Sequence, residues 1–219
     1  MSQPHPEVVF GGTFDPIHKG HLAIARALVQ QLKVTVRFVP VFKPGHRQPC
    51  EVSPDHRMAM LTLALEGERG ILIDPYEFSL GETVPTSQLL RHLRSQLPSV
   101  TPLFFVLGED AFADLPNWVE SDQILEMANL IVIPRTIEKI EGSILSEIPH
   151  LTAIEDNMVP SGRVFQLSFP KVETSATSIR AQLAAGGRSS ALPQSVGDYI
   201  ERQGLYRTPE KTECVTFES

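Results

Sequence analysis

The sequence predicts an α/β protein with one doubly wound parallel sheet, in which helices cover both faces. Short apolar runs rich in β-branched residues alternate with helical patterns along the chain, and this alternation is typical of parallel strands joined by crossover helices. The run 103–107 is apolar throughout and ends at Gly108, as expected of a central strand buried on both faces. Ligands of such sheets bind at the carboxyl ends of the strands, so we expect the site in the loops that follow them.

The individual strands and helices follow from the same patterns. Strands are predicted at 8–10, 34–39, 71–73, 103–107, 130–133 and 164–167. The first helix is predicted from apolar residues at three-to-four spacing, which are Leu22, Ala25, Leu28, Val29 and Leu32. The helix at 54–65 has Ser53 as N-cap and Pro54 at its first position. Further helices are predicted at 88–97, 118–127, 175–185 and 193–203.

Length and composition limit the domain organisation and the class of protein. The 219 residues fit one domain, which we expect to span 1–206, with a loop-rich segment at 138–161 and a flexible tail at 207–219. The net charge of −7 and the lack of a basic tract argue against nucleic-acid binding. No apolar run approaches the roughly 18 residues of a membrane helix, and the polar start of the chain lacks a signal-peptide core. With Cys50 and Cys214 far apart, we expect a cytoplasmic protein with reduced thiols.

The loop after the first strand reads GGTFDPIHKGH, from Gly11 to His21. Its glycines permit a tight turn and the close approach of a phosphate, and the helix that follows offers unpaired N–H groups. His18 and His21 are three residues apart, so both should project to one side of the first helical turn. The segment is therefore a candidate anion site.

Two other interpretations of this loop remain open at this point. A bare HxxH more often belongs to surface histidines beside a simple glycine turn. A zinc site with Asp15 as third ligand is disfavoured, because no second cluster of ligands occurs elsewhere. Neither GxxxxGK[ST] nor GxGxxG is present, which argues against a P-loop protein and a dinucleotide oxidoreductase.

The string GGTFDPIHKGH closely resembles the signature of the HxGH nucleotidyltransferases. This resemblance implies a Rossmann-like doubly wound sheet and the transfer of a nucleotidyl group from a nucleoside triphosphate. It also implies that His18 and His21 are catalytic and contact the ATP phosphates. The glycine turn would cradle the same phosphates through Gly11, Gly12, Thr13 and Phe14.

Two later segments fit the same resemblance. The hydroxyl-rich stretch 174–180 opens a predicted helix and would by itself be a capping sequence. Beside the first motif it resembles the SxTxIR element, which implies that Ser175, Thr177, Ser178 and Arg180 hold ATP phosphates. After the central strand, Gly108 and Asp110 either form a loop with a helix-capping aspartate or match the GxD turn that meets the adenosine.

Several segments resemble the nicotinate mononucleotide branch of these enzymes in particular. They are a PxW segment ending at Trp118, a strand followed by Arg135, an RxxML-like helix starting at Arg57, and a GLY ending at Tyr206. Pantetheine-phosphate enzymes are usually shorter and carry Thr at the position of His18. The branch implies an acceptor pocket formed by Phe14, Lys43, His46, Thr83, Trp118 and Arg135. A buried structural tryptophan is the alternative for Trp118.

The departures from the branch pattern all fall on the acceptor side. Where the branch has PNxxPPH[KR], this chain has Val41 in place of the asparagine and Gly45 in place of the second proline. The SYTxxTL segment of the branch is poorly matched by residues 82–89 of this chain, which contain no tyrosine. Lys43 and Arg47 could still hold a phosphate. Adenylyl transfer is therefore better supported than the identity of the acceptor.

The resemblance implies transfer of the adenylyl group of ATP to nicotinate mononucleotide, giving deamido-NAD and pyrophosphate. Nicotinamide mononucleotide or another phosphorylated acceptor is the alternative, and a non-catalytic nucleotide-sensing module is a third, which the paired histidines disfavour. Arg47 and Arg180 would hold the β- and γ-phosphates. We expect Mg²⁺ to be bound mainly through ATP, without a dedicated protein site, and Asp15 to brace the loop. The sequence does not indicate the oligomeric state.

Overall fold

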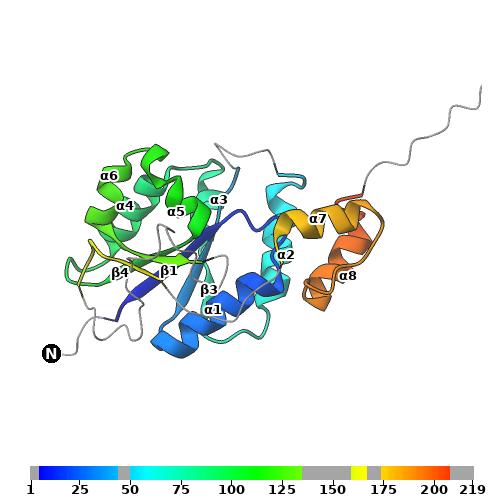
Figure 1. Ribbon diagram of the computed structural model, residues 1–219, viewed down its shortest axis with the longest axis horizontal. Helices are drawn as coiled ribbons and strands as arrows, with labels where there is room; N and C mark the ends of the chain where they lie inside the picture. Colours follow the sequence, from blue (N-terminus) through cyan, green and yellow to red (C-terminus); the bar gives the residue numbers. More distant parts are fainter. Residues whose placement is uncertain (1–4, 44–49, 135–158, 167–173, 208–219) are drawn as a thin grey trace, which may run out of the picture.

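The computed structural model describes residues 5–43, 50–134, 159–166 and 174–207. Its centre is a sheet of six parallel strands in the order β3-β2-β1-β4-β5-β6. The strands are β1 (Glu7–Gly12), β2 (Val36–Pro40), β3 (Ile71–Ile73), β4 (Leu103–Gly108), β5 (Asn129–Ile133) and β6 (Val164–Gln166). The predicted α/β fold with a doubly wound parallel sheet is confirmed (Figure 1).

The helices connect successive strands or follow the last one. They are α1 (Lys19–Leu32), α2 (Pro54–Leu65), α3 (Tyr76–Leu80), α4 (Thr86–Gln96), α5 (Glu109–Ala113), the 3-10 helix η1 (Leu115–Asn117), α6 (Ser121–Met127), α7 (Ala176–Ala184) and α8 (Gln194–Gln203). No helix in the described ranges is long and apolar enough to cross a membrane. Helix α2 has the predicted bounds, and its N-cap is the predicted Ser53, whose hydroxyl accepts from His56 N.

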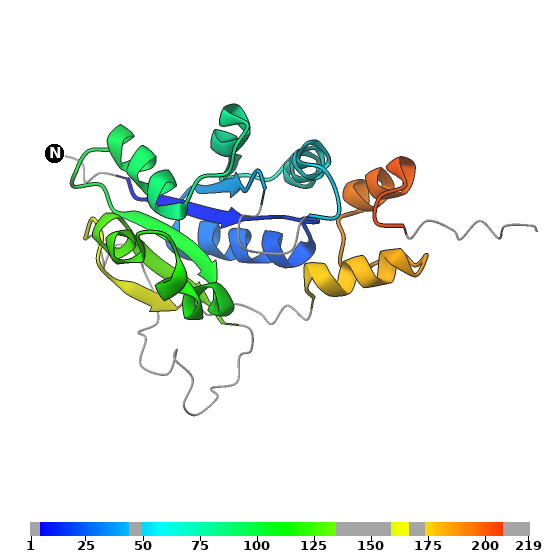
Figure 2. The same cartoon turned by 90° about the horizontal axis from the view of Figure 1, so that it is seen from above.

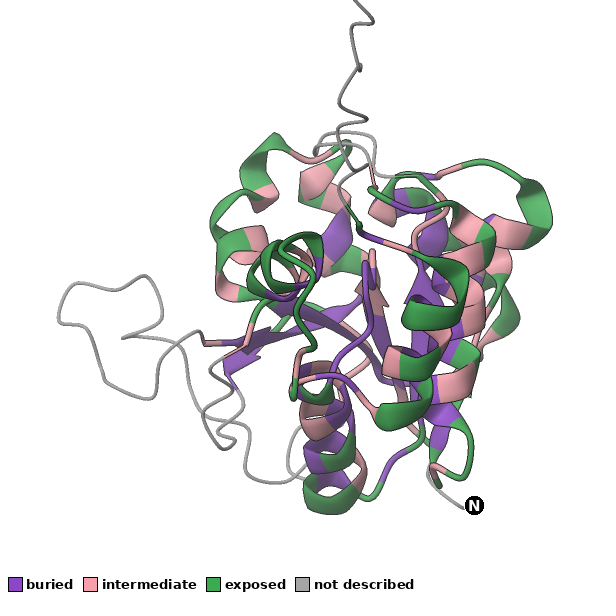
Figure 3. Cartoon of the chain, turned by 90° about the vertical axis from the view of Figure 1, so that its right-hand side faces the viewer, coloured by how far each residue is buried: buried purple, intermediate pink, exposed green. Residues whose placement is uncertain are grey.

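Alternating strand residues contribute to two separate hydrophobic cores, one on each face of the sheet. Val8 and Phe10 of β1 belong to the core cluster that also contains residues of α1, α2, α7 and α8. Val9, between them, packs on the face covered by α4 and α6. This is the period of two that a strand buried on both faces requires. Figure 3 shows the result, with buried residues concentrated in the strands and on the inner sides of the helices.

Four helices differ from the predictions, each for a local reason. Helices α3 and α5 were not predicted, because each has only five residues and shows too little periodicity. Helix α6 begins at Ser121 instead of Trp118, since Glu120 takes a left-handed conformation at its N-cap (φ 52°). Helix α4 begins at Thr86, directly after Pro85, two residues before the predicted start at 88. The segment 138–158 and the tail 208–219 lie outside the described residues.

The strand order reverses between β1 and β4, which lie side by side at the centre of the sheet. In sheets of this kind the connections that follow two such strands leave toward opposite faces, and ligands bind at the carboxyl ends of the strands at this point. Figure 2 shows β1 running toward the end of the molecule where α7 and α8 lie. The glycine-rich loop, Gly108 and the start of α7 therefore belong to the same end of the sheet.

The opposite, amino-terminal edge of the sheet is held by Arg94 of α4. Its guanidinium donates to the carbonyls of Met127 (2.6 Å) and Thr101 (2.5 Å) and to that of Pro160. These three carbonyls precede β5, β4 and β6. One planar group thus joins three connecting segments, although Pro160 O also accepts from Leu103 N at 3.1 Å.

We predict that Arg94→Lys lowers the free energy of unfolding by about 1–3 kcal/mol, because an ammonium cannot serve three carbonyls in this planar arrangement. Denaturant unfolding measures the change. Arg91→Lys is the matched control on the same helix, since Arg91 is exposed and pairs with Glu120 at the surface, and it should change stability by no more than about 0.5 kcal/mol. Equal losses in the two variants would contradict this account.

Candidate active site

Two imidazole rings cap the first turn of α1. His18 is the N-cap residue, and its Nδ1 accepts from Gly20 N at 3.1 Å. His21, three residues on, accepts from His18 N through its own Nδ1 at 3.3 Å. The rings stack with centroids 3.7 Å apart and planes 24° from parallel. As predicted from their spacing, the two histidines lie together on one side of the helix start.

The capping contacts fix the tautomer of both rings. A nitrogen that accepts from a backbone N–H carries no proton, so the ring proton of each histidine lies on Nε2. Burial lowers the pKa of His18 from 6.5 to about 4. Burial, and then the nearby charge of His18, lowers the pKa of His21 well below 6.5. At neutral pH the site therefore presents two neutral Nε2–H donors beside the N-terminus of a helix.

Phe14 packs against one ring of this pair, that of His21. Its side chain is buried, and its ring contacts that of His21 edge to face, with centroids 5.1 Å apart. A Cβ on Gly12 would lie 2.9 Å from the Phe14 ring, which explains why this position of the turn is a glycine. The Phe14 side chain is part of the core. The backbone N–H of Phe14 is therefore the group of this residue that is suited to bind a ligand. A role for its side chain in the acceptor pocket stays a prediction.

Arg180 of α7 reaches back to the same loop. Its Nη1 donates to Asp15 O at 2.8 Å, and its Nε pairs with a carboxylate oxygen of Glu51 at 2.7 Å. Asp15 itself is buried, and it accepts from Tyr206 Oη at 2.6 Å and from Glu51 N at 3.0 Å. Burial, reinforced by the Asp15 charge, raises the pKa of Tyr206. Asp15 thus ties three segments together, as expected of a loop brace.

The predicted phosphate contacts at α7 lie at the start of that helix. Ser175 is the N-cap and accepts from Ser178 N at 3.1 Å, while the Ser178 hydroxyl donates to Ser175 O at 2.9 Å. The capping interpretation of these serines is therefore correct. Thr177 is exposed, and its hydroxyl lies 3.5 Å from Arg180 Nη2. Contact of this segment with phosphates stays a prediction.

Gly108 and Asp110 lie where β4 passes into α5. Gly108 ends β4 and is the N-cap of α5, with Asp110 in the first turn. A Cβ on Gly108 would meet no described atom within 4 Å, so packing does not require glycine there. The space above it is open at the edge where we expect the adenosine.

The predicted acceptor residues are only partly described. Lys43 is exposed, and its backbone N–H donates to Thr83 Oγ1 at 2.6 Å, so the loops after β2 and before α4 are joined. Trp118 is half-buried and donates through Nε1 to Asp114 at 3.3 Å. His46, Arg47 and Arg135 lie outside the described residues.

Two residues with contacts in these loops were not predicted. Arg57 of α2 is 1% exposed, and its guanidinium donates to carbonyls of both the β1 and the β2 loops. Glu77 of α3 is 3% exposed and accepts from Phe42 N at 2.8 Å. Burial raises the pKa of the Glu77 carboxyl to about 7, although Phe42 N–H and Arg57 oppose the shift. The sequence did hold one signal, because Arg57 shares the helix face of the buried Met60 and Leu61.

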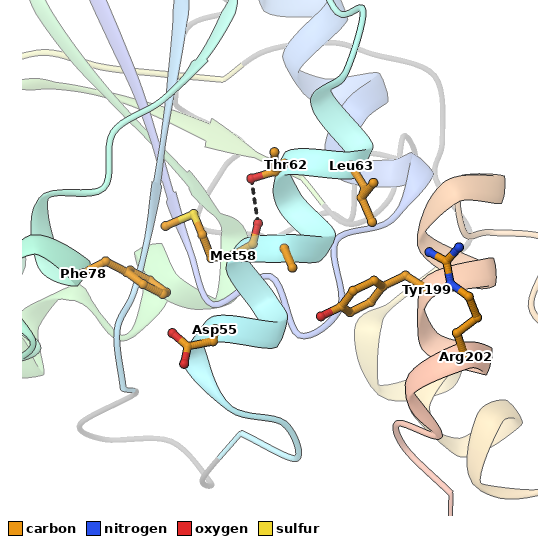
Figure 4. Close-up of a pocket in the computed structure, with 8 residues that line it drawn as sticks. Asp55, Met58, Thr62, Leu63, Phe78, Tyr199 and Arg202 are labelled. Atoms are coloured by element: carbon orange, nitrogen blue, oxygen red, sulfur yellow. Dashed lines mark hydrogen bonds between the residues drawn. The ribbon is translucent and has the colours of Figure 1, made fainter.

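The opposite side of α2 faces an open apolar hollow of about 590 Å³ (Figure 4). It is lined by Asp55, Met58, Ala59, Thr62, Leu63, Phe78, Tyr199 and Arg202. His18 and His21 are not among these residues. We therefore do not assign the active site to this hollow. We assign it to the polar groups at the carboxyl ends of the strands.

Comparison with known proteins shows the family of the chain. Residues 9–182 match the family model described as "Cytidylyltransferase-like". A relative from Stenotrophomonas maltophilia (strain K279a), named "Probable nicotinate-nucleotide adenylyltransferase", is 37% identical over 92% of this chain and 97% of its own length. One of the same name from Laribacter hongkongensis (strain HLHK9) is 36% identical over 91% of this chain and 94% of its own length.

The fold is also shared with solved structures. "Plasmodium falciparum nicotinic acid mononucleotide adenylyltransferase complexed with NaAD" superposes with a TM-score of 0.72 at 23% identity, over 92% of this chain and 97% of that chain. The structure of the same protein complexed with APC gives a TM-score of 0.69 over the same shares. At this identity the likeness shows the fold.

Fold and family model together define a nucleotidyltransferase of the cytidylyltransferase-like class. Within that class, the chain belongs to the family of nicotinate-nucleotide adenylyltransferases, because relatives of that name exceed 30% identity over nearly all of both chains. The resemblance drawn from the GGTFDPIHKGH string is confirmed.

We predict that the imidazole of His18 titrates with a pKa of about 4 in the folded protein, measured by NMR, with His18→Asn identifying its signals. Inorganic tripolyphosphate should raise this pKa, because a bound anion favours the charged ring. A pKa near 6.5 would contradict the burial described above.

The same shift predicts how stability depends on pH. The unfolded chain binds more protons at residue 18 between pH 6.5 and about 4. The contribution of His18 to stability is therefore complete above pH 6.5 and is lost as the pH falls through this window. His18→Asn, which keeps a capping side chain, should weaken that dependence.

Proposed function

We propose that this protein transfers the adenylyl group of ATP to nicotinate mononucleotide, forming deamido-NAD and pyrophosphate. The observation that carries the proposal is the pair of neutral, stacked imidazoles that cap α1 at the carboxyl edge of the sheet. Two N–H donors beside a helix N-terminus suit the phosphates of a nucleotide. The choice of acceptor is supported by the names of the relatives.

The reaction needs positioning and charge stabilisation more than a base. The acceptor phosphate is already an anion at neutral pH, and one of its oxygens attacks the α-phosphorus of ATP. The bond from the α-phosphorus to the oxygen that bridges to the β-phosphorus breaks, and pyrophosphate leaves with that oxygen. His18 and His21 donate from Nε2 to phosphate oxygens and stabilise the charge that develops.

The other predicted residues take supporting roles in this proposal. Backbone N–H groups from Gly11 to Phe14 cradle the phosphates, and Arg180 exchanges its pairing with Glu51 for the β- and γ-phosphates. Gly108 and Asp110 border the adenosine. On the acceptor side, the Lys43–Thr83 loop pair binds the second substrate, with Trp118 beside its pyridine ring.

Magnesium fits this site as a partner of the nucleotide. The groups at the start of α1 described above are mainly N–H donors, and the Asp15 carboxylate already accepts from Tyr206 and Glu51. The described residues contain no group of three His, Cys, Asp or Glu side chains suited to a metal ion. We therefore propose that oxygens of ATP and water hold the ion, which when bound neutralises charge on the departing pyrophosphate.

Pyrophosphate release with ATP and Mg²⁺ tests the reaction and its acceptor. We predict faster turnover with nicotinate than with nicotinamide mononucleotide, measured as kcat/KM. Equal use of both, or preference for the amide, would mean that Val41 and the altered 82–89 segment redirect the acceptor site. Tight ATP binding without pyrophosphate from either acceptor would contradict the proposal and favour a nucleotide-sensing module.

We also predict that His18→Ala and His21→Ala each lower kcat by about 10²–10³, the usual effect of removing one preorganised donor. His18→Asn separates the two roles of that ring, because it retains a cap but loses the imidazole Nε2–H. It should remain as impaired as His18→Ala while recovering stability. His5→Ala is the control, since His5 is exposed near the chain start. Near-normal turnover by either alanine variant would remove that histidine from the mechanism.

A further inference from the structure

Three backbone carbonyls from two different loops converge on the guanidinium of Arg57. Nη1 donates to Thr13 O at 2.8 Å, in the loop after β1, and to Val41 O at 2.7 Å, in the loop after β2. Nη2 donates to Phe42 O. The side chain is 1% exposed. One rigid, planar group therefore joins the loop proposed to hold ATP to the loop proposed to hold the acceptor.

Arg57 binds the carbonyls of two peptide groups in the loop after β2, and the N–H groups of the same two peptides are hydrogen-bonded as well. In a trans peptide the N–H points away from the C=O. The N–H of the Val41–Phe42 peptide donates to the Glu77 carboxylate at 2.8 Å. The N–H of the Phe42–Lys43 peptide donates to Thr83 Oγ1 at 2.6 Å. Arg57, Glu77 and Thr83 thus fix the orientation of two successive peptides beside Lys43.

On the β1 side, Arg57 holds the Thr13–Phe14 peptide through its carbonyl. The N–H of Phe14 then points away from the guanidinium. Aromatic packing keeps this arrangement in place, because the Arg57 guanidinium lies 5.8 Å from the centroid of Phe78 and the Phe78 ring contacts Phe42 edge to face. Arg57 Nε is buried, with no hydrogen-bond partner among the described residues.

We infer that Arg57 is a positioning residue that couples the two substrate loops, with Glu77 completing the coupling on the acceptor side. Binding of either substrate orders the loop it contacts, and Arg57 transmits that order to the other loop. The coupling is reciprocal, so the acceptor tightens ATP binding by the factor by which ATP tightens acceptor binding. At saturation the same contacts set the spacing between the attacking oxygen and the α-phosphorus. This inference rests on the proposed function.

Arg57→Lys tests the inference, because it keeps the charge and loses the planar fork. Calorimetric titrations with a non-hydrolysable ATP analogue, with and without nicotinate mononucleotide, give the coupling factor. We expect about fivefold or more in the wild type and a factor near one in the variant. Each ligand alone should bind within about threefold of its wild-type affinity, while kcat falls by about tenfold or more.

Arg94→Lys is the matched control. Arg94 also donates to three loop carbonyls, but at the opposite edge of the sheet. It should therefore lose stability as Arg57→Lys does, with kcat and the coupling factor unchanged. A merely structural role for Arg57 would make the two variants behave alike.

A second pair of variants applies if Arg57→Lys does not fold. Glu77→Leu removes the acceptor of Phe42 N–H, whereas Glu77→Gln keeps an oxygen in that place. We expect the coupling factor to fall toward one in the leucine variant and to recover in the glutamine variant. Equal coupling factors in these two variants would overturn the role of Glu77.

The binding titrations need no turnover, so the two proposals can fail separately. A wild-type protein that binds both ligands but releases no pyrophosphate contradicts the proposed function. A wild-type protein that releases pyrophosphate without any coupling overturns the inference, and so does full coupling in a folded Arg57→Lys variant.

Discussion

The site depends first on the hydrogen bonds between the start of α1 and the two imidazoles that cap it. A helix N-terminus leaves N–H groups without intrahelical partners, and most helices satisfy them with short polar side chains. Here the capping atoms are ring nitrogens, so the helix itself decides which nitrogen of His18 and of His21 keeps its proton. An aspartate would cap equally well but would turn a negative charge toward a phosphate. The two residues that cap the helix are therefore the same two to which we assign the phosphate contacts.

Loops at the ends of parallel strands carry backbone carbonyls that lie outside the sheet's hydrogen-bond ladders, and in this chain two arginines donate to six of them. Arg94 performs this task at the amino-terminal edge of the sheet and Arg57 at the carboxyl-terminal edge. The chemical arrangement is the same, but only the second edge carries the proposed substrates. The same kind of contact that stabilises the fold at Arg94 therefore lies, at Arg57, between the two loops proposed to hold ATP and the acceptor. In that position it can set the distance between the two substrates.

The sheet, the bounds of α2 and the position of the histidine pair could be predicted, because each follows from local pattern or spacing. The helices α3 and α5 could not, since five residues carry too little periodicity. The spacing of His18 and His21 places both rings on one side but does not reveal that their Nδ1 atoms cap the helix. The contacts of Arg57 join residues 13, 41 and 42, and such long-range partners are invisible to a single sequence.

A crystal structure with a non-hydrolysable ATP analogue and Mg²⁺ tests the central claim most directly. The account predicts phosphate oxygens within about 3 Å of Nε2 of both His18 and His21, and a triphosphate extending from the start of α1 toward Arg180. A triphosphate bound away from the α1 N-terminus, with both imidazoles out of hydrogen-bond reach, would contradict it.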